Sequence, residues 1–195
     1  MSTIADNIGL VSQRIRAAAD AVQRDASSIH LLAVSKTKPA QAVREAYAAG
    51  QLEFGENYLQ EALGKQAELT DLPLSWHFIG PIQSNKTRAI AENFAWVHSV
   101  DRLKIAQRLS EQRPADLPPL NICIQVNVSG EASKSGCTPA DLPALAQAIS
   151  ALPRVKLRGL MAIPEPTEDR AAQALALSVR SDGLSAAELE RVVNS

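Results

Sequence analysis

From about residue 30, short apolar runs rich in β-branched residues alternate with alanine-rich stretches whose apolar positions recur at helical spacing. We predict strands at Ile29–Ser35, Glu53–Gly55, Ser75–Ile79, Trp96–Ser99, Asn121–Asn127 and Lys156–Ile163. We predict helices at Pro39–Ala49, Tyr58–Leu69, Lys86–Asn93, Arg102–Gln112 and Pro139–Leu152, after an amphipathic N-terminal helix within residues 1–25. Repeated strand–helix units imply parallel strands joined by right-handed crossovers.

Two α/β architectures fit this alternation, a closed (β/α)8 TIM barrel and an open doubly wound sheet. The first strand is followed by Ser-Lys-Thr-Lys-Pro, and not by the glycine-rich loop that binds dinucleotides in open sheets. Polar residues instead follow many strands, as in a barrel, which builds its site from several strand ends. They are Lys36, Glu56, Asn57, His77, His98, Ser99 and Asn127. We therefore favour the barrel.

The number of units is too small for a closed barrel. We find six strand–helix units, whereas closure requires eight. Residues 170–195 contain at most one weak strand and one helix and form an atypical tail. We expect residues 1–195 to form a single barrel domain that is incomplete at its C-terminal end.

Composition excludes several classes of function. The chain is 46% hydrophobic and 21% charged, with a formal net charge of −1. It has no basic stripe for nucleic acid and no apolar run of the length that spans a membrane. Two cysteines are too few for a disulfide framework. We expect a cytoplasmic monomer that binds neither nucleic acid nor membranes.

Lys36 is the leading candidate for chemistry. It follows the apolar run Leu31–Val34, at the carboxyl end of a predicted strand. Partial desolvation there would lower the pKa of its ammonium, and the neutral amine could form a Schiff base. Taken by position alone, Lys36 is better explained as a solvated lysine at a strand end.

Three further residues are candidate cofactor contacts. Asn57 follows a glycine at a strand end, where it could either bind a ligand or begin the next helix. His77 alternates with Trp76 and Phe78, and a single histidine in such a run is usually a core residue. Met161, in the last predicted strand, has the pattern of a core residue too. We find no metal-ligand cluster or Ser-His-Asp arrangement.

Taken together, the motifs are more specific. The segments AVSKTKP, FGENYLQEA, WHFIGPIQSNK, VHSVD, QVNVSGEASKSG and GLMAIP occur in this order over residues 1–166. In order and spacing they resemble the YggS/PROSC family of pyridoxal phosphate homeostasis proteins. The resemblance implies the fold of the alanine racemase N-terminal domain, with pyridoxal 5′-phosphate (PLP) bound as a Schiff base to the lysine of AVSK, which is Lys36.

The resemblance also implies a carrier with no turnover of its own. Such a protein would buffer PLP, deliver it to PLP-dependent apo-enzymes and so affect amino-acid and keto-acid balance. A racemase on this barrel uses a tyrosine from a second domain, whereas Tyr47 and Tyr58 fall on predicted helices here. The alternatives are a racemase-like or other Schiff-base enzyme, and a truncated fragment without function.

The chain departs from the family after GLMAIP. Members continue into a serine-rich strand end and a further strand, which hold most of the phosphate. Here Ser178 and Ser181 could replace the first of these loosely, and the second is not recognisable. We expect a truncated or frame-shifted C-terminus and, without the phosphate anchor, weak and exchangeable PLP binding.

Overall fold

The structure is a computed structural model that describes residues 2–128 and 135–163. The chain divides into two compact units, Met1–His77 and Phe78–Ser195. The atypical tail at 170–195 lies outside the described residues, as do Ser178 and Ser181. The expectations for that segment therefore stay predictions.

The first unit alternates helices and parallel strands. Its elements are α1 (Ile4–Ala21), the 3₁₀ turn η1 (Ala26–Ser28), β1 (Ala33–Val34), α2 (Ala40–Ala48), β2 (Glu53–Glu56), α3 (Leu59–Glu68) and β3 (Ser75–Phe78), whose last residue belongs to the second unit. Strand β1 pairs with β2 in parallel, with Val34 opposite Gly55. The Ser75 N–H donates to the Leu52 carbonyl at 2.9 Å, which joins β3 to β2. The strands thus lie side by side in chain order.

Local signals explain where the helices of this unit begin and end. Thr3 and Asp6 form a capping box at the start of α1, each side chain accepting from the other's backbone N–H. Pro39 is the N-cap of α2, where its missing N–H costs nothing. Gly50 follows α2 with φ of 91°, a conformation that glycine adopts without strain.

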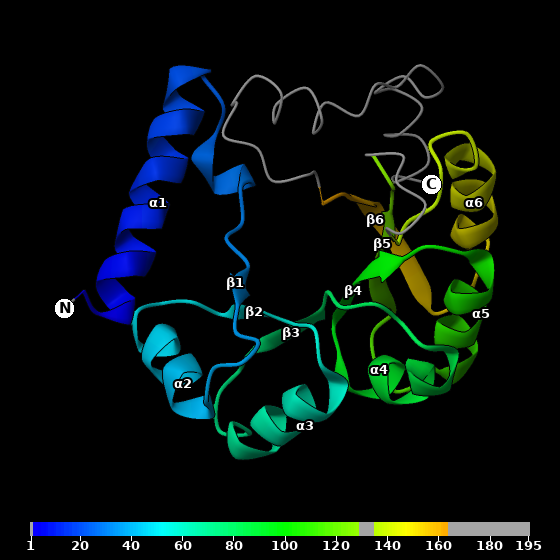
Figure 1. The fold of residues 1–195 in the computed structure, drawn as a ribbon, viewed down its shortest axis with the longest axis horizontal. Coiled ribbons are helices and arrows are strands. Elements are labelled where there is room, and N and C mark those ends of the chain that lie inside the picture. Colours follow the sequence, from blue (N-terminus) through cyan, green and yellow to red (C-terminus); the bar gives the residue numbers. More distant parts are fainter. Residues whose placement is uncertain (1, 129–134, 164–195) are drawn as a thin grey trace. The chain divides into compact units, whose positions relative to one another are not determined.

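The second unit repeats the same alternation. Its elements are the 3₁₀ turn η2 (Ser84–Lys86), α4 (Thr87–Asn93), β4 (Trp96–Val100), α5 (Leu103–Gln112), β5 (Leu120–Gln125), α6 (Leu142–Ser150) and β6 (Val155–Met161). Strand β5 pairs in parallel with β4 and with β6. The three α-helices lie side by side along one face of these strands (Figure 1). Ile105, Leu109, Ile122 and Ile124 are fully buried between the two layers.

The predicted elements within the described residues are confirmed, and two are clearly shorter than expected. Helix α6 comprises Leu142–Ser150, whereas the predicted helix is Pro139–Leu152. Sequence pattern predicts the first strand over Ile29–Ser35, whereas β1 comprises only Ala33–Val34. The Leu31 carbonyl is bound by the side-chain amide of Gln51 at 2.7 Å. Because a side chain takes the place of a strand partner there, the ladder begins two residues later.

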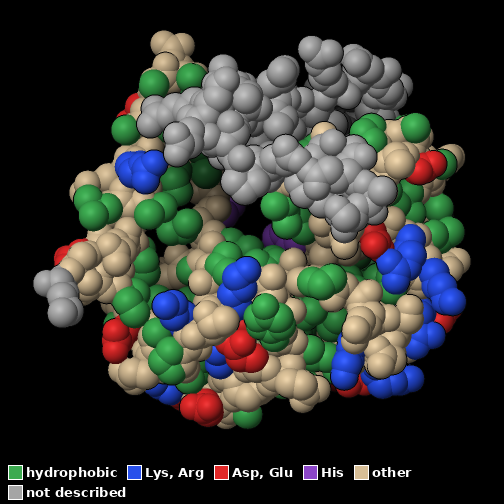
Figure 2. All heavy atoms as spheres, in the orientation of Figure 1, with side chains coloured by type: hydrophobic (Ala, Val, Ile, Leu, Met, Phe, Trp, Pro, Cys, Tyr) green, Lys and Arg blue, Asp and Glu red, His purple; other side chains and the backbone are tan. Residues whose placement is uncertain are grey.

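Charges on the surface are mixed in sign. On the face drawn in Figure 2, Lys and Arg side chains gather over α4 and α5 of the second unit. Within α4, Arg88 pairs with Glu92, and just before α5, Arg102 pairs with Asp101. Such exposed pairs contribute little to stability.

Arg113 is a buried arginine that links several backbone segments of the second unit. Its residue is 5% exposed, and its guanidinium donates to the carbonyls of Ala91, Phe94 and Pro118 at 2.6–2.8 Å. Burial lowers the pKa of this guanidinium from its usual value. One side chain thus satisfies three carbonyls at the end of α4 and before β5.

We predict that Arg113→Met lowers the free energy of unfolding by about 2–4 kcal/mol, because buried carbonyls lose their charged donor. Urea unfolding followed by circular dichroism measures the change. The matched control is Arg88→Met, whose side chain is 68% exposed. It should change stability by less than about 0.5 kcal/mol. Equal losses in the two variants would contradict the role given to Arg113.

Candidate functional site

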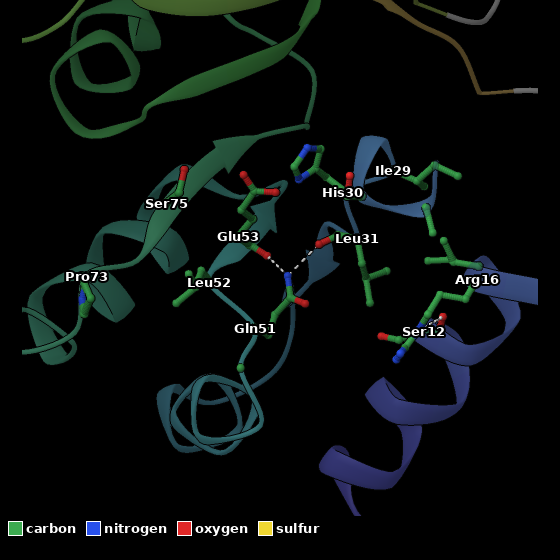
Figure 3. Close-up of a pocket in the computed structure, with 14 residues that line it drawn as sticks. Ser12, Arg16, Ile29, His30, Leu31, Gln51, Leu52, Glu53, Pro73 and Ser75 are labelled. Atoms are coloured by element: carbon green, nitrogen blue, oxygen red, sulfur yellow. Dashed lines mark hydrogen bonds between the residues drawn. The ribbon is translucent and has the colours of Figure 1, made fainter. Parts of the chain in front are cut away.

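A cavity in the first unit lies at the amino ends of its strands. It has a volume of about 650 Å³ and is lined by residues of α1 and of the segments that lead into β1, β2 and β3. Gln51 lies at its wall and donates to the Leu31 and Glu53 carbonyls (Figure 3). Folds of this type place their chemistry at the opposite, carboxyl ends of the strands. The candidate site is therefore expected at the carboxyl ends of the strands.

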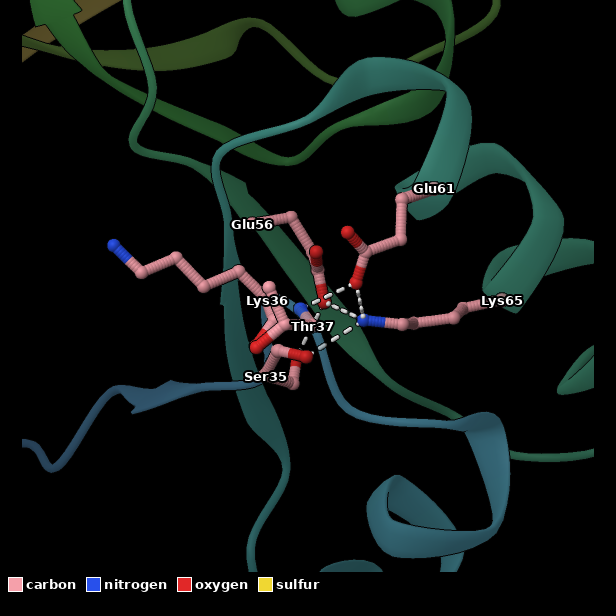
Figure 4. Close-up of polar contacts among 6 residues, drawn as sticks. All are labelled: Ser35, Lys36, Thr37, Glu56, Glu61 and Lys65. Carbon is pink, nitrogen blue, oxygen red and sulfur yellow. Dashed lines mark hydrogen bonds and ion pairs between the residues drawn. The ribbon is translucent and has the colours of Figure 1, made fainter.

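Lys36 lies at that carboxyl edge, two residues beyond β1. Its side chain is exposed and extends away from the acidic residues beneath it (Figure 4). Burial therefore does not supply the desolvation expected for this amine in the described structure. A reactive role for Lys36 would have to rest on its position at the strand edge.

The chain turns tightly around Lys36. The Lys38 N–H donates to the Ser35 carbonyl at 3.1 Å, and the Thr37 hydroxyl donates to the Lys36 carbonyl at 2.6 Å. Thr37 has φ of 63°, in the left-handed region that a β-branched residue rarely adopts. Nothing in the sequence signals this conformation, since Asn or Gly is the usual residue there.

A buried ion cluster lies beneath this turn. Lys65 of α3 points its Nζ at Glu56 Oε1 (2.7 Å), Glu61 Oε1 (2.6 Å) and the Ser35 carbonyl (2.6 Å). The Ser35 hydroxyl donates to the same Glu56 oxygen at 2.6 Å, and the Thr37 N–H donates to Glu61 Oε1 at 2.6 Å (Figure 4). We call Glu56, Glu61 and Lys65 the Lys65 cluster.

Sequence reasoning missed the Lys65 cluster. The only signal for it is the i,i+4 spacing of Glu61 and Lys65, which is usually a solvated helix pair. The packing of α3 against the strand ends distinguishes this pair from a solvated one. It buries the Lys65 side chain to 6% exposure and the Glu56 side chain completely.

The electrostatics of the cluster are complementary. The hydrogen bond from Lys65 is the largest influence on Glu61 and lowers its pKa below the usual value. Burial opposes this shift, and the hydrogen bond from the Thr37 N–H and the charge of Lys65 add smaller lowering effects. All three donors of the Lys65 ammonium have acceptors, two of them carboxylates. An amine held in this way is not available as a nucleophile. Among the three lysines of the region, Lys36 and Lys38 are the exposed ones.

Two buried oxygens at this edge accept no hydrogen bond from the described residues. They are Glu56 Oε2 and Asn57 Oδ1. Because Val34 lies opposite Gly55, Lys36 and Asn57 each lie two residues beyond this pair. An unpaired buried acceptor is unfavourable, so Asn57 Oδ1 is suited to a donor on a ligand held beside Lys36.

The other two candidates lie elsewhere. His77 is 4% exposed within β3, where its Nε2 lies 3.2 Å from the Ser75 hydroxyl. Met161 is the last residue of β6, in the second unit, and its carbonyl accepts from the Val126 N–H at 2.9 Å. The structure thus places Lys36 and Asn57 just beyond two neighbouring paired strands. Cofactor contacts by Asn57, His77 and Met161 stay predictions.

The described residues limit the other kinds of site. They include no cluster of three or more His, Cys, Asp or Glu side chains placed to hold a metal ion. None of their helices combines the length and the apolar character needed to cross a bilayer.

Comparison with known proteins defines the class. The model of the alanine racemase N-terminal domain family matches residues 11–190. Alanine racemase from E. faecalis is 13% identical, with a TM-score of 0.64 over 94% of this chain and 47% of that enzyme. A likeness at this identity shows the fold alone. The protein is therefore an α/β protein of the alanine racemase N-terminal type, as the strand–helix pattern and the resemblance predict.

Closer relatives define the family. The pyridoxal phosphate homeostasis proteins of Pseudomonas aeruginosa and Escherichia coli are 78% and 55% identical, over 89% and 87% of this chain and 75% and 74% of their own lengths. PipY of Synechococcus elongatus, solved with PLP bound, is 43% identical with a TM-score of 0.73, over 92% of this chain and 83% of PipY. The chain belongs to the pyridoxal phosphate homeostasis family, YggS/PROSC.

The lowered pKa of Glu61 predicts how the cluster responds to acid. A carboxyl whose pKa is lower in the folded protein than in the unfolded chain stabilises the fold when it is ionised. This stabilisation is fully present above the pKa of the unfolded chain, 4.5, and is lost as the pH falls through the lower pKa of the folded protein. We expect the difference in unfolding free energy between the protein and Glu61→Gln to be constant near neutral pH and to shrink below about pH 4.5. Urea unfolding from pH 7 to pH 3.5 measures it.

Glu45→Gln, on the exposed side of α2, is the control, and its difference from the parent should be small throughout. A Glu61→Gln difference that stays constant across the whole range would contradict the ionised role of Glu61.

Proposed function

We propose that this protein binds PLP and takes part in PLP homeostasis, holding the cofactor as a Schiff base on Lys36. The observation that carries the proposal is an exposed lysine at the carboxyl edge of the strands, in a family whose member PipY has been solved with PLP bound. The relatives that match most of the chain are named for PLP homeostasis.

The chemistry requires an amine that can reach an aldehyde. The electron pair of the neutral Lys36 amine forms a bond to the aldehyde carbon of PLP. Both amine protons then leave with the carbonyl oxygen as water, and a C=N bond remains. When bound, PLP supplies a conjugated ring that withdraws electrons from that bond.

The first unit provides a second contact. Asn57 Oδ1 is a buried acceptor beside Lys36, and a donor on the cofactor would satisfy it. His77 and Met161 complete the set of proposed cofactor-binding residues.

We propose a carrier without turnover of its own. The ammonium of Lys65, beneath the Lys36 turn, donates all three of its hydrogens to acceptors. It has no free electron pair and therefore cannot serve as a base that takes a proton from a substrate. A Schiff base without a partner base stores an aldehyde better than it turns over a substrate. PLP-dependent apo-enzymes are the proposed recipients, and we expect the carrier to be a cytoplasmic monomer.

The experiment is to add PLP to the purified chain, record the visible spectrum, reduce with borohydride and map the modified lysine by mass spectrometry. We expect yellow colour that reduction fixes on Lys36. Lys36→Met should lower the yield of reduced adduct at least about tenfold, because orientation gives the native amine its advantage.

Lys38→Met is the matched control, since Lys38 is equally exposed and two residues away. It should keep the colour and the label on Lys36. A folded parent chain that takes up no label on Lys36 would refute the covalent role.

A racemase-like activity is the second candidate, and one observation favours it. Tyr58 is not inside a helix as predicted; it is the N-cap of α3, 57% exposed, directly after Asn57 at the carboxyl end of β2. Its hydroxyl is thus carried at the same edge as Lys36. This position is open to a proton-transfer role that the sequence pattern does not reveal.

Racemisation of L-alanine by the PLP-loaded chain, followed by chiral chromatography, separates the two functions. We expect no turnover above free PLP, and the same result for Tyr58→Phe. Turnover that falls at least about tenfold in Tyr58→Phe would replace the carrier with an enzyme.

A further inference from the structure

The peptide groups on both sides of Lys36 are held by the Lys65 cluster. On one side, the Ser35 carbonyl accepts from Lys65 Nζ at 2.6 Å. On the other, the Thr37 N–H donates to Glu61 Oε1 at 2.6 Å. The backbone of Lys36 is therefore fixed from both directions, and with it the direction in which its side chain leaves the chain.

The turn would not keep this shape by itself. Thr37 has φ of 63°, and a β-branched residue in this region persists only where surrounding contacts impose it. Glu61 supplies the contact from outside the turn. Its own position is in turn set by Lys65, which lies 2.6 Å from the same carboxylate oxygen and 2.7 Å from the fully buried Glu56.

The turn carries two amines that could react. Lys36 and Lys38 are both exposed, and the same chemistry is open to each. Which of them captures an aldehyde depends on where the backbone aims it, since small errors in orientation reduce reactivity strongly. Strain held at this turn is the kind of feature that fixes such a choice.

We propose that Glu61 and Lys65 are positioning residues that hold the strained Thr37 turn and so select Lys36 over Lys38 as the amine that takes the aldehyde. This inference rests on the proposed PLP-binding function. It assigns a role to a buried ion cluster that otherwise would only stabilise the fold.

Two substitutions of Glu61 distinguish the effect of its side-chain length from the effect of its charge. Glu61→Gln keeps the length and an acceptor oxygen for the Thr37 N–H but loses the charge. Glu61→Asp keeps the charge beside Lys65 but is one methylene shorter, so its carboxylate no longer reaches Thr37. A purely electrostatic or structural role would make Gln the more harmful change, whereas positioning makes Asp the more harmful one.

The readout is the site of labelling. The full chain and each variant are treated with an equimolar amount of PLP, reduced with borohydride and digested with a protease that does not cut at lysine. Tandem mass spectrometry then gives the ratio of pyridoxyl label on Lys36 to that on Lys38. Thermal unfolding, recorded in parallel, shows that each variant is folded.

We expect Glu61→Gln to keep the parent ratio and Glu61→Asp to lower it about fivefold, which corresponds to about 1 kcal/mol of lost preference. Thr37→Gly adopts the left-handed conformation without strain. In the double variant Thr37→Gly with Glu61→Asp, the logarithm of the Lys36-to-Lys38 label ratio should therefore recover at least half of the decrease caused by Glu61→Asp.

The outcomes separate this inference from the proposed function. A parent chain without label on Lys36 refutes both the covalent role and its positioning. A labelled parent with an unchanged ratio in Glu61→Asp, or with equal losses in the Asp and Gln variants, refutes the positioning alone. If Glu61→Asp does not fold, Lys65→Met is substituted for it, and an unchanged ratio there counts against the inference in the same way.

Discussion

The interaction on which the candidate site depends is the buried contact of Lys65 Nζ with Glu56, Glu61 and the Ser35 carbonyl. The Glu61 carboxylate stays partly exposed, at 30%. Removing the Lys65 ammonium and the Glu56 carboxylate from water is costly, and close opposite charges offset that cost only when the geometry is good. The three short contacts, with the hydroxyl and N–H donors of Ser35 and Thr37, meet this requirement. The carboxyl ends of β1 and β2 and the start of α3 are tied together by this one group.

The rest of the site follows from this anchor. Because the cluster holds the peptide groups around Lys36, a strained residue can stay at Thr37, and the direction in which the Lys36 side chain leaves the backbone is fixed. The same packing leaves Asn57 Oδ1 buried and without a donor beside it. A rigid Lys65 cluster beneath a solvent-facing amine is compatible with the proposed capture and later release of an aldehyde, because neither step requires the cluster to move.

Family membership and local geometry support each other here but answer different questions. The similarity to pyridoxal phosphate homeostasis proteins and to PLP-bound PipY concerns the fold and the cofactor. The arrangement around Lys36 concerns which amine is proposed to act, and why. In that proposal, position replaces desolvation as the explanation, because Lys36 is exposed. Tyr58, at the N-cap of α3, is the residue through which a catalytic alternative would have to operate.

The sequence by itself determined the strand–helix order, the helix ends at Pro39 and Gly50 and the family, and it predicts Lys36 as the lysine that binds the cofactor. These depend on local periodicity, on residues with restricted or unusually free backbones, and on short motifs, all of which can be read along the chain. Only the tertiary structure decided that Lys65 is buried between Glu56 and Glu61, that β1 is short and that Thr37 is strained. Each of these results from contacts between residues distant in sequence, and the Glu61–Lys65 spacing looks the same in a solvated helix until α3 packs against the strand ends.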